Sequence, residues 1–454
     1  MCPDINEAHH DIFFEFYRDK CLVYAPLRNV AAWVNRTAGE MLQQSLGNAL
    51  PGVLPVALEP LREQLAQTPR KPPAPPEGTF APRQVSFLPT NGCNMRCLYC
   101  APAAGDRDTG VMPLEVCEAG LRYQAEVVQR FNYGSLTVSL FGGEPFCAWD
   151  QVRYIVETGK RLADELARPF IITADTNAFM SPTKAHWAAQ NMNYLVVSLD
   201  GPRSIHDLNR PSATGSGTYD AVARTLDIFA AEGLGYTLRC TVSAGMVDLL
   251  PEIAGHFCQR FRPRNMNFEP LMRTGRCLES DLKTPGIPQY VNAVVAAGKV
   301  AREHGVGLKF GMVRPERLDC SSCLVACDHL VLAPDGLAAA CYAADHRESE
   351  YAPLFSLGAY DFETRTLRID QKRVELMRSY AVHDIPRCQG CFCQWHCAGG
   401  CRIHHSPPYC TDAPGAMCAA TRRLTLWRIL QDMGLSAEAD QIRLEEEETN
   451  ALAA

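Results

Sequence analysis

Apolar and polar positions after residue 83 form a repeating pattern, in which short apolar runs alternate with longer amphipathic segments. The apolar runs predict strands at residues 85–89, 136–141, 170–174, 194–199, 236–242 and 266–268. The segments between them predict helices, including those at residues 113–131, 149–166, 218–232 and 250–261. Repeated β–α units favour an α/β fold with helices outside a parallel sheet. The strands read as continuous apolar runs, as expected where both faces of a sheet are covered. The pattern leaves open whether the sheet is flat or curved into a partial barrel.

The residues before this region predict a small separate unit. Within residues 1–67, strand-like runs at residues 12–17, 21–26 and 31–35 precede amphipathic segments at residues 38–46 and 56–65. Residues 68–82 contain six prolines, a composition typical of an extended linker. We therefore expect an N-terminal α+β unit, a linker, and an α/β body at residues 83–312.

The remainder of the chain differs in composition. From about residue 315 it is rich in cysteine, glycine and proline, and the pattern predicts few regular elements. Metal binding can order such a segment, because its free energy contributes to folding. We expect this loop-rich domain to span residues 313–420 and C-terminal helices to follow within residues 421–454. The helical patterns at this end lie at residues 419–432 and 437–448.

Composition changes this picture through one residue type. Of 454 residues, 21 are cysteine, whereas 47% are hydrophobic and the net charge is −7. A chain of this length can build a sufficient core, so it needs no disulfide framework. No apolar run reaches the ~18 residues of a membrane span, and the N-terminus lacks the features of a signal peptide. We expect a cytoplasmic protein that binds metal and contacts no membrane. The scattered Lys and Arg residues predict no nucleic-acid binding.

Three cysteines are grouped directly after the first predicted strand of the α/β body. Cys93, Cys97 and Cys100 have the spacing CxxxCxxC. Parallel α/β folds bind ligands at the carboxyl ends of their strands, where this loop begins. Three thiolates can hold three irons of a [4Fe–4S] cluster and leave the fourth iron open to a reactant. The alternatives are a zinc site, which would need a fourth ligand, or structural thiols.

This spacing, with Tyr99 before the last cysteine, resembles the signature of the radical S-adenosylmethionine (SAM) enzymes. A second segment extends the resemblance, since Gly142, Gly143, Glu144 and Pro145 match the GGEP element at the end of the second strand. Glycines there allow the backbone to approach a ligand. The resemblance implies that the GGEP element hydrogen-bonds the amino group of SAM and that Tyr99 belongs to the cofactor site.

Two later strand ends also resemble family elements. Asn177 lies in a sequence similar to the TNG element, with Ala178 in place of the glycine. The stretch containing Ser198, Asp200 and Arg210 resembles the SLDGP…HD…R segment. The resemblance implies that Ser198 and Arg210 hold the carboxylate or ribose of SAM, with Asp200 close by. The alternatives are a strand-end cap or a surface ion pair, and a turn in the case of Asn177.

The resemblance also implies a mechanism. The open iron chelates the amino and carboxylate groups of SAM, and one electron from the reduced cluster cleaves SAM to methionine and a 5′-deoxyadenosyl radical. That radical abstracts a hydrogen atom from the substrate. The cofactor supplies the chemistry, while the protein positions it and excludes water and oxygen.

Eleven cysteines lie between Cys320 and Cys418, in a pattern that resembles the SPASM domain of radical SAM enzymes. The resemblance implies two auxiliary [4Fe–4S] clusters, and therefore three clusters in the chain. One auxiliary cluster would take Cys341, Cys401 and two of Cys320, Cys323 and Cys327, and the choice between these three stays open. The other would take Cys388, Cys391, Cys397 and Cys418. A zinc ribbon is the alternative.

These assignments leave three cysteines over: one of the group Cys320, Cys323 and Cys327, together with Cys393 and Cys410. A spare thiol near a radical site can donate a hydrogen atom to a substrate radical, as in radical SAM peptide epimerases. The alternative is an ordinary thiol, and we interpret the seven isolated cysteines elsewhere in the chain as small buried hydrophobes.

Two features bear on the substrate. SPASM proteins mostly modify peptides or proteins, and the anaerobic sulfatase-maturing enzymes have an aspartate base directly after the cysteine of GxxxxC. Here that position is Tyr342, a poor base at an ordinary pKa of ~10. Residues 34–42 and the strands before them resemble winged-helix-like modules that bind a leader peptide by strand addition. A packing or dimerisation appendage is the alternative.

We therefore expect a partial (β/α)6 radical SAM barrel between a small N-terminal unit and a SPASM domain. The expected function is maturation of a ribosomally made precursor peptide that carries a leader, most simply by forming a cross-link. A one-electron reductant such as flavodoxin or ferredoxin would be a partner. The alternatives are protein oxidation of the sulfatase-maturase type, peptide epimerisation, and a non-catalytic iron–sulfur scaffold or electron carrier.

Overall fold

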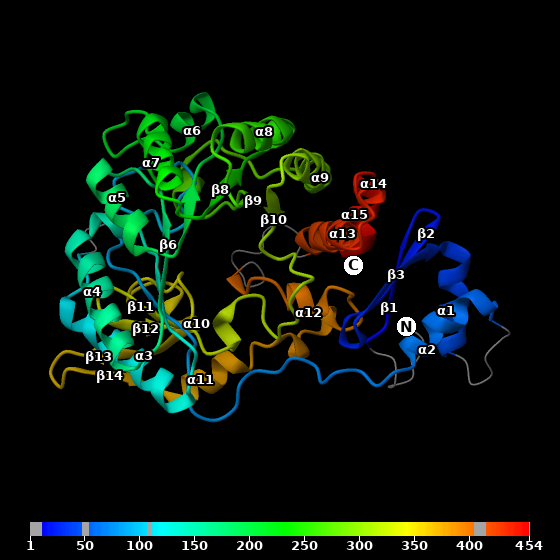
Figure 1. Cartoon of the computed structure of the whole chain (residues 1–454), viewed down its shortest axis with the longest axis horizontal. Helices are drawn as coiled ribbons and strands as arrows, with labels where there is room; N and C mark the ends of the chain where they lie inside the picture. Colours follow the sequence, from blue (N-terminus) through cyan, green and yellow to red (C-terminus); the bar gives the residue numbers. More distant parts are fainter. Residues whose placement is uncertain (1–10, 48–53, 107–109, 404–414, 454) are drawn as a thin grey trace. The chain divides into compact units, whose positions relative to one another are not determined.

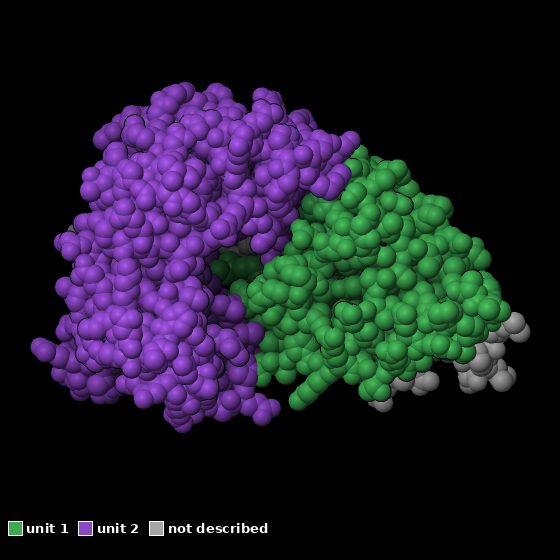
Figure 2. All heavy atoms as spheres, viewed as in Figure 1, with its two compact units in different colours: residues 1–75, 312–323, 380–454 green, residues 76–311, 324–379 purple. Residues whose placement is uncertain are grey.

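Two compact units make up the chain. The computed structural model describes residues 11–47, 54–106, 110–403 and 415–453. Unit 1 combines residues 1–75, 312–323 and 380–454, and unit 2 combines residues 76–311 and 324–379 (Figure 2). None of the described helices is both long enough and apolar enough to cross a membrane.

A parallel sheet forms the centre of unit 2 (Figure 1). Its strands are β4 (Val85–Phe87), β5 (Leu136–Leu140), β6 (Phe170–Thr176), β7 (Tyr194–Ser198), β8 (Tyr236–Val242), β9 (Asn265–Pro270) and β10 (Gly307–Lys309). They lie side by side in chain order and every neighbouring pair is parallel. The predicted α/β fold with serial β–α units is therefore confirmed.

The sheet continues beyond β4. β11 (Leu330–Leu332) pairs with β4 in parallel, and β12 (Leu337–Ala339), β13 (Ser356–Asp361) and β14 (Thr366–Ile369) follow in antiparallel order. Among the described residues the sheet has eleven strands and ends at β10 and β14, so it is not closed into a ring. The expectation of few regular elements after residue 315 is wrong for these strands, because short segments such as Leu-Ala-Ala carry little periodicity.

Helices cover one face of the parallel sheet, as Figure 1 shows. They are α3 (Leu114–Phe131), α4 (Trp149–Glu165), α5 (Pro182–Asn191), α6 (Arg203–Asn209), α7 (Tyr219–Ala231), α8 (Leu250–Arg260) and α9 (Ile287–Glu303). At Gly120 in α3, a Cβ atom would lie 2.7 Å from the ring of Phe87, which identifies the helix-covered face of β4. Ser86 lies on the opposite face, since neighbouring strand residues alternate.

The strands β6 to β9 alternate in burial, which corrects the expectation of continuous apolar runs with both faces covered for this part of the sheet. All three residues of β4 are buried, as expected. In β8, Leu238, Cys240 and Val242 are fully buried, whereas the side chain of Arg239 between them is 44% exposed. In β6, Ile172 and Ala174 are buried in the same way. These four strands therefore have an apolar face against the helices and a polar face that water reaches.

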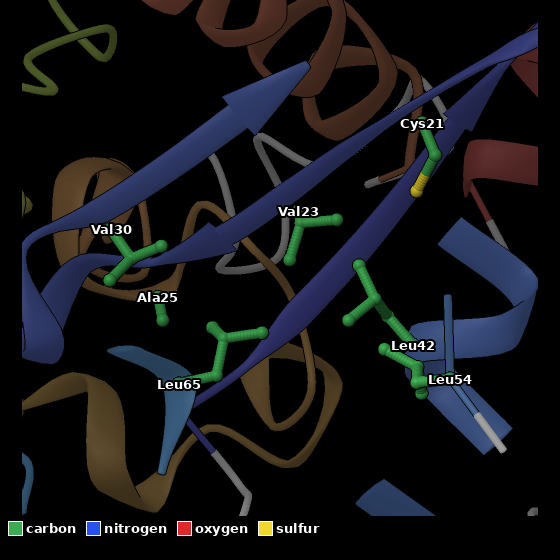
Figure 3. Close-up of a cluster of buried hydrophobic side chains, with 7 residues drawn as sticks. All are labelled: Cys21, Val23, Ala25, Val30, Leu42, Leu54 and Leu65. Carbon is green, nitrogen blue, oxygen red and sulfur yellow. The ribbon is translucent and has the colours of Figure 1, made fainter. Parts of the chain in front are cut away.

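Unit 1 contains an antiparallel sheet with the strand order β1-β2-β3. β1 (Phe13–Tyr17), β2 (Lys20–Ala25) and β3 (Val30–Asn35) precede α1 (Arg36–Gly47) and α2 (Glu59–Leu65). Their buried side chains meet on one face of the sheet (Figure 3): Cys21, Val23, Ala25, Val30, Leu42, Leu54 and Leu65. Cys21 is thus a small core residue, as interpreted from the sequence, whereas the same interpretation is wrong for Cys147, which is exposed.

The C-terminal part of unit 1 contains α12 (Gln394–Cys397), α13 (Gly415–Asp432), α14 (Ser436–Ala439) and α15 (Glu446–Ala453). The single helix expected at residues 437–448 is wrong, because the chain leaves the helix after Ala439 and resumes it at Glu446. Ile442 and Leu444 are both buried while Gln441 and Glu445 are exposed. Burial of every second residue belongs to extended chain and not to a helix.

Candidate functional site

The cysteine loop after β4 is fixed by backbone hydrogen bonds. The N–H of Leu98 donates to the carbonyl oxygen of Asn209 at 3.0 Å, and the N–H of Cys100 donates to that of Cys97 at 3.2 Å. Cys93, Cys97 and Cys100 are all partly exposed. Burial, together with the neighbouring charges of Glu144, Cys97 and Cys100, raises the pKa of Cys93 to about 12. The three thiols of the loop therefore lie near one another.

Arg276 fixes the same loop from the segment after β9. Its Nη1 atom donates to the carbonyl oxygen of Cys97 and its Nη2 atom to that of Ala104, both at 2.9 Å. Nη2 also pairs with Asp106 at 2.7 Å. Sequence reasoning missed Arg276, because nothing in its local pattern marks a contact with a loop more than a hundred residues away.

The Gly142–Gly143 pair approaches the chain just before Cys93. Gly142 has a φ of +113°, and a Cβ atom there would lie 2.6 Å from the carbonyl oxygen of Thr90. At Gly143 a Cβ atom would collide with the carbonyl oxygen of Gly92. The amide of Gly143 donates to the carbonyl oxygen of Thr90 at 3.0 Å. Both glycines are therefore required by backbone contact between two strand ends.

Glu144 joins this loop to the end of β6. Its carboxylate accepts hydrogen bonds from the N–H of Phe146 at 3.1 Å, the hydroxyl of Thr176 at 2.8 Å and the N–H of Asn177 at 2.7 Å. Burial raises the pKa of Glu144 to about 7, and these hydrogen bonds oppose that rise. Pro145 is buried at the first position of the short 3₁₀ helix that follows.

Asn177 connects β6 to the cysteine loop. Its Nδ2 atom lies 3.6 Å from the sulfur of Cys93 and donates to Oδ1 of Asn94 at 2.9 Å. Its Oδ1 atom accepts from the N–H of Phe179 at 2.8 Å, as in a turn. Ala178 has a φ of +55°, in the left-handed region where glycine is the usual residue. Asn177 is thus both a turn residue and a neighbour of Cys93.

Asp200, Arg210 and Tyr99 form a buried polar cluster. Oδ1 of Asp200 lies 3.1 Å from Nε of Arg210, and the two side chains are 0% and 8% exposed. The Tyr99 hydroxyl donates to Oδ2 of Asp200, and the Arg210 guanidinium lies 5.1 Å from the centre of the Tyr99 ring. Nη1 of Arg210 is 3.8 Å from the sulfur of Cys97. The pair is therefore no surface ion pair but part of the cysteine-loop environment.

Ser198 ends β7 and is half-buried. In the sheet it lies beside Arg239 of β8, on the polar face. It is thus separated from the Asp200–Arg210 cluster by the turn that follows the strand. Among the predicted residues of this part of the chain, Ser198 has the weakest structural link to the cysteine loop.

The remaining cysteines are divided between the units. Cys327 and Cys341 belong to unit 2, whereas Cys320, Cys323, Cys388, Cys391, Cys397, Cys401 and Cys418 belong to unit 1. Burial raises the pKa of Cys397, and the charges of Cys391, Cys418 and Cys388 raise it further. These four thiols of unit 1 are therefore near neighbours, drawn from two separate segments of the chain.

Cys393 is buried beside this group. Its thiol hydrogen-bonds that of Cys391 and lowers the pKa of Cys391 to about 7. Cys410 lies outside the described residues. Within the described ranges, no three histidine, cysteine, aspartate or glutamate side chains form a group able to hold a single metal ion. A [4Fe–4S] cluster makes a different demand, because each of its cysteines binds a separate iron.

Comparison with known proteins identifies the domain that carries the cysteine loop. Residues 87–250 match the family model of the radical SAM superfamily. A cysteine-type anaerobic sulfatase-maturating enzyme of Clostridium perfringens is 22% identical over 177 residues, which cover 38% of this chain and 47% of that enzyme. The chain thus spans about half the length of the curated relatives it matches.

Solved structures show the same fold. Native anSMEcpe with bound AdoMet matches with a TM-score of 0.59 at 16% identity, covering 79% of this chain and 100% of that chain. Streptococcus suis SuiB bound to S-adenosylmethionine matches with a TM-score of 0.52 at 15% identity, covering 87% of this chain and 95% of that chain. At these identities the likeness concerns the fold. The segment at residues 87–250, which contains the cysteine loop, therefore matches the radical SAM superfamily.

Proposed function

We propose that this chain is a radical SAM enzyme that matures a peptide or protein substrate. The observation that carries the proposal is that the segments after three strands, β5, β6 and β7, converge on the cysteine loop after β4. Cys93 contacts Asn177, Cys97 contacts Arg210, and the Gly142–Gly143 backbone packs on the residues just before Cys93. All of these residues lie inside the segment that matches the superfamily model.

The donor set of this loop fits a [4Fe–4S] cluster with one open iron. Cys93, Cys97 and Cys100 would hold it, and no fourth cysteine lies in the loop. Bound together, the cluster and SAM supply a carbon-centred radical that abstracts a hydrogen atom from the substrate. The raised pKa values of Cys93 and Cys97 imply that the thiols release protons when they bind iron.

The surrounding residues have distinct tasks in this proposal. Arg210 puts a positive charge beside Cys97, where it favours a thiolate and the carboxylate of SAM. Asp200 fixes the direction of the Arg210 and Tyr99 side chains. Glu144 holds the backbone of the Gly142–Pro145 loop against the end of β6, which leaves that backbone to hydrogen-bond the amino group of SAM.

Two auxiliary [4Fe–4S] clusters belong to the proposal. Cys388, Cys391, Cys397 and Cys418 would hold one of them, and the mutual electrostatic influence of these thiols supports that set. Cys341 and Cys401 with two of Cys320, Cys323 and Cys327 would hold the other, as the SPASM spacing implies. The reconstituted protein should then contain about twelve irons, and a content of about four would contradict the auxiliary clusters.

The substrate we propose is a precursor peptide with a leader, and the reaction is cross-link formation. One neighbour with a solved structure, native anSMEcpe, has been solved with AdoMet and the Cp18Cys peptide, and its fold matches with a TM-score of 0.58. In unit 1, β3 lies at the end of the described three-stranded sheet. An extended leader could add to that edge as a further strand. A flavodoxin or ferredoxin would deliver the electron.

A second candidate reaction is oxidation of a protein residue, as in sulfatase maturation. The match to the cysteine-type anaerobic sulfatase-maturating enzyme favours it. Tyr342 argues against it, because burial raises the pKa of this phenol further above its ordinary value. Peptide epimerisation is the third outcome, and a non-catalytic iron–sulfur scaffold would cleave no SAM.

One experiment separates these outcomes. The reconstituted protein, SAM, a reductant and the candidate precursor peptide are incubated together, and 5′-deoxyadenosine and peptide mass are followed. Loss of two hydrogen atoms with a new bond in fragment spectra supports the cross-link. The same loss without a new bond indicates oxidation, and an unchanged mass with altered stereochemistry indicates epimerisation. The Cys93→Ala, Cys97→Ala, Cys100→Ala triple variant should form no 5′-deoxyadenosine, while Cys258→Ala, a buried position of α8, should retain it. Formation by the triple variant would contradict the proposed cluster site.

A further inference from the structure

The polar face of the parallel sheet holds a carboxylate that the proposed cofactor site does not use. Asp175 lies in β6, directly before Thr176 and Asn177. Those two residues bind Glu144, and Asn177 also contacts the sulfur of Cys93. Ala174 and Thr176 are buried on the helix-covered face, so Asp175 lies on the opposite, polar face. Asp175 therefore lies on the polar face of the sheet, two residues before Asn177 of the proposed cofactor site.

The Asp175 carboxylate is crowded by protein yet open to water. Its side chain keeps 34% of its exposure. Burial raises its pKa to about 6, and the positive charge of Arg239 opposes that rise. The nearest approach of Arg239 is 4.0 Å, between Nη1 and Oδ1. Within the described ranges, neither a backbone nor a side-chain hydrogen bond contributes to the pKa of Asp175.

Other carboxylates of this region are occupied. Asp200 and Glu144 accept hydrogen bonds from named protein groups. Glu269, on the polar face of β9, accepts from the N–H of Gly311 at 3.0 Å and also feels the charge of Arg239. Asp175 differs from these carboxylates, because water reaches it and, among the described residues, no protein hydrogen bond contributes to its pKa. Asp175 therefore stands apart as an acceptor with capacity left for a substrate.

Tyr342 is not available to accept a proton from a substrate. Nδ1 of His329 faces the carbonyl oxygen of Ala340 at 3.1 Å and so carries the ring hydrogen. Its Nε2 atom then accepts from the Ser86 hydroxyl at 3.0 Å, which leaves the Ser86 oxygen to accept from the Tyr342 hydroxyl at 2.9 Å. The Tyr342 hydroxyl thus donates into a series of hydrogen bonds through Ser86 and His329 that ends at the backbone carbonyl of Ala340. The charge of Asp175 also raises the pKa of Tyr342, so the two groups are neighbours.

We propose that Asp175 is the general base of this enzyme, and that it accepts a proton from an O–H, S–H or N–H group of the substrate residue under attack. The inference rests on the proposed function. In the step, the bond between the substrate atom and its hydrogen breaks, the electron pair stays on the substrate, and the proton joins a carboxylate oxygen of Asp175. The carboxylate becomes a neutral acid, so no further reactant is needed for this step.

The charged and titratable groups around Asp175 agree with this role. The positive charge of Arg239 on β8 lowers the pKa of Asp175 and so opposes the effect of burial. Glu269 on β9 partly neutralises Arg239, and Tyr342 after β12 is uncharged. A base with a pKa of about 6 is ionised at neutral pH and can still be protonated during the reaction. The expected substrate donor is an O–H, S–H or N–H group of a side chain, so the substrate residue is polar and not purely aliphatic.

The test compares reconstituted Asp175→Asn and Asp175→Glu with the wild-type enzyme and Asp164→Asn, an exposed carboxylate on α4. Two readouts are followed: 5′-deoxyadenosine formed without peptide, and modified peptide formed at saturating peptide. We expect Asp175→Asn to lose product formation by about 100-fold while SAM cleavage without peptide is unchanged. Asp175→Glu should recover part of the product, and Asp164→Asn should match the wild type.

The pH profile gives the decisive signature. Wild-type product formation should fall as the pH drops through about 6, since protonation removes the base, and Asp175→Asn should lack this limb. The proposal would be overturned if Asp175→Asn formed as much product as the wild type and showed the same pH profile. Loss of SAM cleavage in Asp175→Asn would also overturn it, because Asp175 would then support the cofactor site. Absence of SAM cleavage in the wild type would instead refute the proposed function itself.

Discussion

The carboxylate of Asp200 lies 3.1 Å from Nε of Arg210, and neither side chain is more than 8% exposed. Two charges removed from water depend on each other, because either one alone would be an unpaired buried charge. The same Arg210 approaches Cys97. The Asp200–Arg210 pair thus connects the cysteine loop to the segment after β7. Removal of either charge should lower the free energy of unfolding.

The first prediction concerns this pair. Asp200→Asn should lower the free energy of unfolding of the apo-protein by about 3–5 kcal/mol, because Arg210 would be left buried without a counter-charge. Chemical denaturation measures the change. Asp220→Asn is the matched control, since it removes the partner of Arg203 in an exposed ion pair. Equal stability of the two variants would show that the buried pair does not hold the loop.

The second prediction concerns the backbone contact at Gly142. Gly142→Ala should destabilise the protein by at least about 1 kcal/mol, because a positive φ and a short Cβ contact add strain. It should also lower the iron bound in reconstitution, since Thr90 must move and Cys93 is three residues away. Gly134→Ala is the control, because a Cβ atom there meets no neighbour within 4 Å. Normal iron content in Gly142→Ala would contradict the requirement for close approach.

The third prediction is a pH dependence of stability due to Glu144. Its pKa is about 7 in the folded protein against an ordinary value of 4.5, because burial disfavours the charged carboxylate. Between these values the folded protein keeps a proton that the unfolded chain has released. The contribution of the protonated Glu144 to the free energy of unfolding is therefore fully present below pH 4.5 and is lost as the pH rises through 7.

For the apo-protein this amounts to a fall of about 3 kcal/mol in the free energy of unfolding across that interval. Glu144→Gln cannot titrate, so the difference between wild type and variant should change with pH in that interval and be constant outside it. Only the slope is diagnostic, because the amide also disturbs the hydrogen bonds from Thr176 and Asn177. Parallel curves for the two proteins would show that Glu144 titrates normally.

The fourth prediction tests the edge of β3. Ala31 and Ala32 are adjacent, so one directs its backbone groups toward β2 and the other toward the open edge. Proline at the outward position removes a donor without disturbing the pairing with β2. That variant should keep its melting temperature and lose about tenfold in affinity for the precursor peptide, measured by fluorescence anisotropy.

The other proline variant is its internal control, because it breaks the β2–β3 ladder and should lower the melting temperature. Unchanged peptide affinity in the variant that keeps its melting temperature would reject strand addition at β3. A packing role for this unit would then be the better interpretation.

Local signals explain what could be predicted from the sequence. The strands β5 to β8 were found because their helix-facing residues, such as Val138 and Leu238, are strongly apolar. The cysteine loop and the Gly142–Pro145 segment were found because their spacing is local. Polar residues alternate with these apolar ones, among them Asp175 and Arg239. Nothing in the sequence around these two residues marks them as neighbours. Only the strand register brings them to the same face.

Long-range pairing explains what the sequence missed. Arg276 and Thr176 act on partners that are distant in the chain, so their roles have no local signature. The strands β11 to β14 have few β-branched residues and are ordered by strand pairing, since β11 pairs with β4 and β12 to β14 follow from β11. At the C-terminus, residues 437–448 are rich in the helix formers Ala and Glu, but Ile442 and Leu444 are buried as extended chain. Tertiary burial decided each of these cases against local propensity.

β4 lies between β5 and β11, so the strand that leads into the cysteine loop is an interior strand only while β11 is present. A protein truncated after residue 312 would expose the backbone groups of Val85, Ser86 and Phe87 along a fresh, apolar edge. Such an edge invites association with other chains. We therefore expect that the segment matching the superfamily folds only together with the strands that follow it. The match at residues 87–250 marks a region of sequence likeness and not an independently folding domain.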